Sequence, residues 1–231
     1  MKNIFVLLLI MVFAGSTAFA QKDENKRIGI AGQVIVEILN VPDNIPQDLL
    51  NKAECVIVLP SVTKFAFGFG GSYGRGVMTC RSGPHFNGRW SAPTMMALEG
   101  GSFGLQLGGQ STDFVLLIMN RRGANAILST QVKLGGDVAA AAGPVGRNAA
   151  ASTDISMRAE ILSYSRSRGL FAGISLAGST LRPDNDGNER LYGKNVSGKD
   201  IVINSKIRPP ASAKLLLSTL DKKSPHHKSG E

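Results

Sequence analysis

The chain has 231 residues, a formal net charge of +9, two cysteines and three histidines. This length suffices for one domain with a sizeable core, or at most two small ones. The cysteines and histidines lack the spacing of zinc ligands, and the glycine-rich stretch "GFGGSYGRG" lacks the spacing of a Rossmann or P-loop nucleotide site. The basic residues are not interleaved with aromatic side chains, so a nucleic-acid partner is not expected.

Residues 1–20 have the pattern of a secretory signal peptide, with one lysine, an apolar run from Ile4 to Ala14 and an A-x-A ending. We expect cleavage between Ala20 and Gln21 and an exported protein, secreted or periplasmic, that is soluble or peripheral to a membrane. Residues 61–130 carry six basic groups against two acidic ones. Such a cationic body favours an anionic lipid surface or envelope polymer as partner.

Residues 21–54 are expected to form an N-terminal helical segment. Ile28, Ala31, Ile35 and Ile38 recur at helical spacing, which predicts an amphipathic helix. Two roles are open for its apolar side: packing against a core, which we favour, or lying in a membrane interface with the isoleucines inserted. A second, short helix is expected at residues 46–54.

From residue 55 onward, short apolar runs separated by glycine recur about every ten residues. This spacing predicts an α+β fold that is mainly antiparallel β: a compact, glycine-rich, barrel-like or sandwich domain with N-terminal amphipathic helices. Glycines within strands indicate bulges or close backbone approach. The β-rich core is expected to span 55–195, and 196–231 to hold an edge strand at 197–204, a helix at 211–223 and a disordered tail.

The two cysteines, Cys55 and Cys80, flank apolar runs that antiparallel pairing can bring together. In an oxidising compartment such a pair favours a disulfide. The alternative is a pair of small buried residues on neighbouring strands.

The segments Gly100–Gly104 and Gly70–Gly74 both match G-x-S-x-G, the pattern of a hydrolase nucleophile elbow, with Ser102 as the candidate nucleophile. A serine hydrolase also needs an ordered histidine. His85 precedes Ser102 in the chain, and the other two histidines lie in the polar C-terminal tail. We therefore favour glycines and small serines in tight turns, and we expect neither catalysis nor a cofactor.

Four longer stretches occur in this order: "GFGGSYGRGVMTCR", "WSAPTMMALEGGSFGLQLGGQSTDFVLLIMN", "KLGGDVAAAAGPVGR" and "AEILSYSRSRGLFAGISLAGSTLRPD". Together they closely resemble the SYLF domain, and the chain is identified as an exported, bacterial-type member of that family. The similarity extends over about residues 25–195.

The resemblance implies non-enzymatic binding of anionic phospholipid, phosphoinositides in eukaryotic members, by a module also described as actin-binding. With a signal peptide and no SH3 or FYVE companion, actin is not an expected partner here, and phosphatidylglycerol-like or cardiolipin-like lipids are the physical substitutes. The alternatives are a structural envelope protein that binds a protein partner and, less favoured, the Ser102 hydrolase. The lipid-binding residues that the resemblance implies are Lys26, Arg27, Arg75, Arg147 and Arg168.

Overall fold

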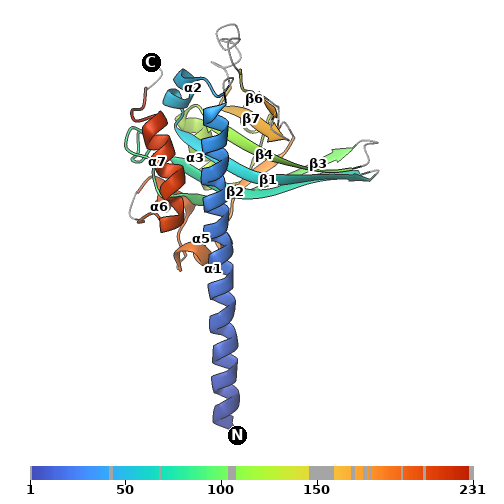
Figure 1. Cartoon of the computed structure of the whole chain (residues 1–231), viewed down its shortest axis with the longest axis vertical. Helices are drawn as coiled ribbons and strands as arrows, with labels where there is room; N and C mark the ends of the chain where they lie inside the picture. Colours follow the sequence, from blue (N-terminus) through green and yellow to red (C-terminus); the bar gives the residue numbers. More distant parts are fainter. Residues whose placement is uncertain are drawn as a thin grey trace.

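One curled sheet with helices on both faces forms the body of the molecule in this computed structural model (Figure 1). The structure describes residues 2–41, 44–67, 69–103, 108–145, 159–167, 170–173, 176, 178–193, 195–204 and 207–228. The helices are α1 (Lys2–Asn40), α2 (Gln47–Lys52), α3 (Arg121–Ser129), α5 (Asn185–Tyr192), α6 (Gly198–Val202), the 3-10 helix η2 (Ala211–Ala213) and α7 (Lys214–Lys223). The strands are β1 (Cys55–Phe67), β2 (Phe69–Cys80), β3 (Thr94–Phe103), β4 (Gly108–Ile118), β5 (Val132–Lys133), β6 (Ala140–Ala142), β7 (Ile161–Ser167), β8 (Leu170–Gly173) and β9 (Thr180–Pro183).

The described strands form a nine-stranded sheet in the order β5-β9-β3-β2-β1-β4-β7-β6, with β8 paired to β7. Every pairing is antiparallel except that of β6 with β7. The prediction of an α+β, mainly antiparallel fold is confirmed. Of the two architectures left open, the single curled sheet matches the barrel-like one, because no second sheet packs on it within the described part of the chain.

Both faces of the sheet are buried where the helices cover it, which explains why the strands read there as continuous apolar runs. On one face α1, α5 and α7 pack against side chains such as Val56, Val77 and Val115. On the other face α3 and α6 cover the alternate positions, among them Ile57 and Leu116. The period-two alternation of a strand thus divides each long strand between two cores.

Helix α1 settles the role of the amphipathic segment. Ile28, Ala31, Ile35 and Ile38 are all fully buried against the sheet. The favoured core-packing role is therefore correct, and insertion of these isoleucines into a membrane is wrong, because they are already in the protein interior. Figure 1 shows the N-terminal half of α1 projecting away from the body. Within the described part of the chain, no helix combines the length and apolar character that crossing a membrane requires.

Cys55 and Cys80 are direct partners in the β1–β2 register and are joined by a disulfide. Both lie in the core beneath α3. The bond closes the two strands at the end opposite to their connecting turn.

The C-terminal region differs from the expectation in two places. The predicted edge strand at 197–204 is helix α6, capped by the side chain of Ser197 on the backbone N–H of Asp200. The chain after α7 is docked rather than free as far as residue 228: Ser224 is fully buried and accepts a hydrogen bond from Arg81 at 2.7 Å. Arg81 itself stacks on Trp90, 4.1 Å from the ring centroid. The sequence did not reveal this anchor, because the segment around Ser224 is polar and its partner Arg81 lies far away in the chain.

Gly76 allows the close crossing that bends the sheet. A Cβ built there would lie 2.0 Å from the carbonyl oxygen of Val58, beside the register shift of β1 that falls between Val58 and Thr63. The predicted close backbone approach at a strand glycine is therefore present.

We expect Gly76→Ala to lower the free energy of unfolding by about 1–3 kcal/mol, because the added methyl group displaces the β1 backbone. The matched control is Gly29→Ala in α1, where nothing lies within 4 Å of the added Cβ. There alanine is expected to stabilise the helix by up to about 1 kcal/mol. Urea denaturation of both variants gives the comparison, and equal effects would contradict this account of the sheet.

The docked tail also predicts a pH dependence of stability. Burial raises the pKa of Glu54 to about 7, against the opposing charges of Arg121 and Arg81, and His227 lies 3.6 Å from its carboxylate. Since the folded state holds this proton more tightly than the unfolded state, the Glu54 contribution to stability falls as pH rises from about 4.5 to about 7. Burial lowers the pKa of His227, which acts in the opposite sense.

The difference in the free energy of unfolding between wild type and Glu54→Gln isolates the contribution of this carboxyl group. We expect the variant to gain stability relative to wild type as pH rises through this range. Denaturant titrations at several pH values measure it, and parallel pH profiles would show that Glu54 titrates normally.

Candidate anion-binding pocket

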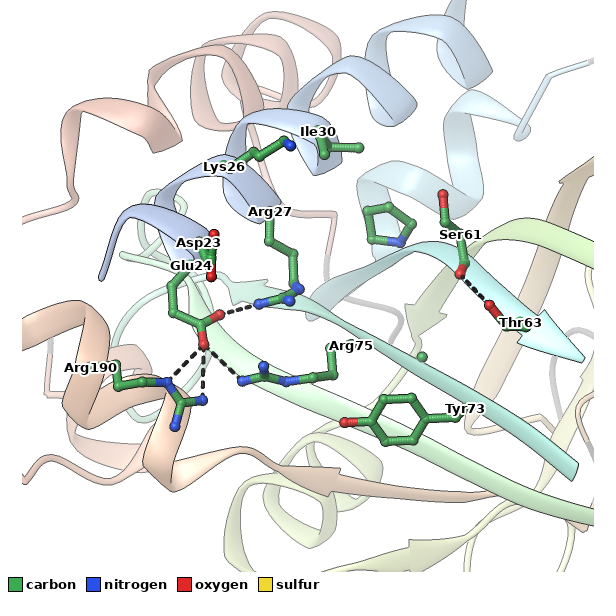
Figure 2. Close-up of a pocket in the computed structure, with 12 residues that line it drawn as sticks. Asp23, Glu24, Lys26, Arg27, Ile30, Ser61, Thr63, Tyr73, Arg75 and Arg190 are labelled. Atoms are coloured by element: carbon green, nitrogen blue, oxygen red, sulfur yellow. Dashed lines mark hydrogen bonds and ion pairs between the residues drawn. The ribbon is translucent and has the colours of Figure 1, made fainter. Parts of the chain in front are cut away.

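A pocket of about 510 Å³ lies between the α1 segment at residues 23–30, the bend of β1 and β2, and α5 (Figure 2). It collects residues that are far apart in the sequence. The lining residues are Asp23, Glu24, Lys26, Arg27 and Ile30 from α1, Pro60, Ser61 and Thr63 from β1, Tyr73, Gly74 and Arg75 from β2, and Arg190 from α5.

The carboxylate of Glu24 lies at the base of this pocket and is 1% exposed. Its Oε1 accepts hydrogen bonds from Arg75 at 2.8 Å and from Arg190 at 2.9 Å, and its Oε2 pairs with Arg27. Figure 2 shows the three guanidinium groups converging on this one side chain. A buried carboxylate needs such partners, because desolvation of an unpaired charge is costly.

A second carboxylate, Asp184, completes the network behind Arg75. It caps the N-terminus of α5 by accepting from the backbone N–H of Gly187, and it accepts from Arg75 Nε at 2.7 Å. Burial alone would raise the pKa of Asp184, but these two donors lower it below its usual value. Burial alone would lower the pKa of Arg75, but its interactions with Asp184 and Glu24 raise it above the usual value. Arg75 is therefore a fixed cation held between two carboxylates.

The pocket keeps cationic groups that are open to solvent. Lys26 is exposed, and no carboxylate among the described residues forms an ion pair with it. The side chains of Arg27 and Arg190 are 25% and 33% exposed and each has several N–H donors. Tyr73, 49% exposed, stands beside them with its hydroxyl directed toward the pocket (Figure 2).

The β1 side of the pocket is shaped by an irregular turn of the strand. Ser61 has a φ of 51°, unusual for a residue with a side chain, and its N–H donates to Asp113 at 2.9 Å. This bond from the neighbouring strand holds the kink, so Pro60 and Thr63 face the pocket as fixed walls.

Three of the five residues expected to bind lipid meet in this pocket: Lys26, Arg27 and Arg75. Arg147 and Arg168 lie outside the described residues, so their roles stay predictions. Arg75 differs from the expectation in one respect, because its charge is already balanced by Asp184 and Glu24.

The elbow hypothesis for Ser102 is wrong in its geometry. Ser102 lies in β3 opposite Gly70, and Ser72 lies in β2 opposite Gly100. An elbow places the serine at a sharp turn between a strand and a helix, whereas both serines lie within paired antiparallel strands. The favoured interpretation of serines in tight turns is wrong for the same reason. Among the described residues no three His, Cys, Asp or Glu side chains gather in a way that could hold a metal ion.

Comparison with known proteins identifies the family. Residues 99–223 match the family model described as Ysc84, a Las17-binding protein actin regulator. The chain belongs to this family, and the resemblance to the SYLF domain is confirmed. Relatives include LAS seventeen-binding protein 3 of Saccharomyces cerevisiae, 35% identical over 80% of this chain and 40% of the relative, and SH3 domain-containing YSC84-like protein 1 of Homo sapiens, 33% identical over 79% of this chain and 52% of the relative.

The SYLF chain thus spans about half or less of the length of these curated relatives. The yeast relative is named for binding LAS seventeen, and the family model is described as an actin regulator. The pocket combines residues inside the matched region with residues that precede it. Arg190 lies inside residues 99–223, and the contributions of α1, β1 and β2 come before that region.

Sequence reasoning missed Glu24, Asp184, Arg190 and Tyr73. A signal for Glu24 was present, since it precedes Ile28 by four residues and continues the buried stripe of the helix as its one acidic member. A sequence signal was also present for Asp184, because an aspartate just before the first turn of a helix is a favourable N-cap. The segment 182–193, which the expected β-rich core included, contains helix α5.

We expect Glu24→Gln to lower the free energy of unfolding by about 2 kcal/mol, since three guanidinium groups lose a charged acceptor. The matched control is Glu37→Gln, which removes the same charge from the same helix at a side chain that is 51% exposed and paired with Arg166. Its effect is expected to stay below about 1 kcal/mol. Chemical denaturation measures both, and similar losses would contradict the central role of Glu24.

Proposed function

We propose that this SYLF domain binds anionic phospholipid at a membrane surface, with the headgroup phosphate in the pocket over Glu24. One observation carries the proposal: four cationic side chains, Lys26, Arg27, Arg75 and Arg190, line the pocket against two carboxylates, Asp23 and Glu24. The excess of positive charge favours an anion, and the volume of about 510 Å³ accommodates a group as large as a lipid headgroup.

The cationic side chains divide into two roles in this proposal. Arg75 lies between Glu24 and Asp184 and acts as a positioning residue that fixes the electrostatic field of the pocket. Lys26, Arg27 and Arg190 contact the phosphate oxygens, because they keep exposed surface and unused donors. Guanidinium groups suit this task, since their paired N–H donors match two phosphate oxygens.

We also propose that the domain works outside the cytoplasm after removal of residues 1–20. Three observations support this. The N-terminal half of α1 projects from the body (Figure 1), and Gln21, the first residue after the expected cleavage site, donates a hydrogen bond to the backbone of Leu191 in α5. Cleavage there leaves the packed part of α1 intact. The disulfide between Cys55 and Cys80 also fits an oxidising compartment.

A second candidate function is binding of a protein partner. It is favoured by the description of the family model, a Las17-binding protein actin regulator, and by the yeast relative that is named for binding LAS seventeen. The pocket is compatible with it, because an acidic side chain or a chain terminus presents the same charge as a phosphate. Lipid is preferred here because the expected export separates the chain from cytoplasmic partners.

Vesicle co-sedimentation of the chain from Gln21 tests the lipid proposal. We expect binding to vesicles that contain phosphatidylglycerol, little binding to pure phosphatidylcholine, and loss of binding at high salt. Lys26→Glu should weaken binding about ten-fold or more, since each basic residue near an anionic leaflet contributes about 1 kcal/mol and the new carboxylate is repelled.

The matched control is Lys133→Glu, which makes the same charge change at an exposed position on β5, outside the pocket lining. It should bind like wild type. Equal weakening by both variants would point to nonspecific charge attraction, and an absence of binding to anionic vesicles would favour the protein partner.

A further inference from the structure

Asp23 differs from Glu24, the other acidic residue of the pocket lining, in its partners. Glu24 is paired with three arginines, whereas Asp23 forms neither an ion pair nor a side-chain hydrogen bond with any described residue. Asp23 is also exposed, and Figure 2 shows it beside Glu24 on the α1 side of the pocket. The pocket therefore contains one carboxylate that is available to a ligand.

The competition between the two carboxylates explains why Asp23 stays unpaired. Arg27 follows Asp23 by four residues, a spacing that allows an ion pair on a helix. Its guanidinium group pairs with Glu24 instead. A buried carboxylate without partners costs far more than an exposed one, so Glu24 is the acceptor that has to be satisfied. Arg75 and Arg190 are held by Glu24 for the same reason.

A free cation lies next to Asp23 on the same side of the helix. Lys26 follows Asp23 by three residues, and side chains at this spacing have their Cβ atoms about 5–6 Å apart. Both residues line the pocket, both are exposed, and no ion pair joins them. The exposed part of the pocket thus presents a positive and a negative group close to each other.

Tyr73 adds a hydroxyl group that suits ligand groups of either sign. Its side chain is 49% exposed, and the hydroxyl is directed toward the pocket (Figure 2). A phenolic hydroxyl can accept a hydrogen bond from an ammonium group and can donate one to a phosphate oxygen. The pocket therefore offers contacts to a zwitterionic group as well as to an anion.

A phosphate alone does not make full use of this arrangement. Asp23 repels a phosphate that is bound beside it by Lys26, because like charges at short range interact unfavourably. A primary ammonium group on the same ligand offsets this repulsion and donates hydrogen bonds to the carboxylate. The cavity of about 510 Å³ has room for both groups.

We propose that the pocket selects phospholipid headgroups that carry a primary ammonium group beside the phosphate, as phosphatidylethanolamine does, and that Asp23 determines this specificity. The inference rests on the proposed function and names the headgroup that the pocket prefers within an anionic leaflet. The phosphate lies with Lys26, Arg27 and Arg190, and the ammonium group donates to Asp23. The two-carbon link of ethanolamine keeps its charges as close together as Asp23 and Lys26 are. Phosphatidylcholine lacks this contact, because its quaternary ammonium group has no N–H to donate.

Vesicles of equal charge test the selectivity. Two sets contain the same fraction of phosphatidylglycerol, and the remaining lipid is phosphatidylethanolamine in one set and phosphatidylcholine in the other. We expect the chain from Gln21 to bind the first set about two- to five-fold more tightly, as a partly exposed ion pair allows. Asp23→Asn should abolish this difference, because the amide keeps the shape of the side chain and removes its charge.

The matched control is Glu189→Gln on α5, which removes a negative charge at an exposed position outside the pocket lining. It should keep the preference of wild type. Soluble glycerophosphoethanolamine and glycerophosphocholine separate headgroup recognition from the properties of the bilayer. The ethanolamine compound should displace wild type from the vesicles at a lower concentration than the choline compound does.

The outcomes separate the selectivity from the proposed function. Equal binding of wild type to both vesicle sets would overturn the selectivity and leave headgroup binding intact. A preference that survives in Asp23→Asn, or equal displacement by the two soluble compounds, would assign the preference to the bilayer and would also overturn the selectivity. A lack of binding to both vesicle sets would overturn the proposed function together with the inference.

Discussion

The buried carboxylate of Glu24 is the constraint on which the site depends. It joins α1 to β2 through Arg75 and to α5 through Arg190, which is 166 positions away, and it also pairs with Arg27 on α1 itself. Because the carboxylate is buried, it holds the three arginine side chains in fixed positions around it. Three positive charges outweigh its single negative charge, so the cluster remains cationic. The same interaction that closes the helix onto the sheet therefore also creates an anion-binding surface.

The charge of the pocket and the shape of the sheet act together in the proposed function. The close approach at Gly76 and the kink at Ser61 bend β1 and β2. The bent part of the two strands forms a wall of the pocket, and their far ends extend away from the body. The electrostatic contribution of the pocket is long-ranged and sensitive to salt, so it would draw the domain toward a charged leaflet.

Much of the fold could be predicted, because helices and strands leave hydrophobic patterns in the local sequence. The spacing of Ile28, Ala31 and Ile35 indicated a core-packing helix, and the apolar runs between glycines indicated antiparallel strands. The site was harder, because its partners are distant in the chain: nothing local in "DNDGNERLYG" links Asp184 and Arg190 to Glu24. Arg75 was named for lipid contact because its two carboxylate partners could not be seen without the tertiary structure.

An NMR titration of the chain from Gln21 with a soluble, short-chain phosphatidylglycerol tests the central claim most directly, since it needs no membrane. The account predicts that the largest chemical-shift changes fall on the guanidinium Nε–H groups of Arg27 and Arg190 and on the amides of residues 23–30, and that they saturate. Saturable shifts confined to another surface, or no shifts at ligand concentrations below micelle formation, would contradict an anion site built over Glu24.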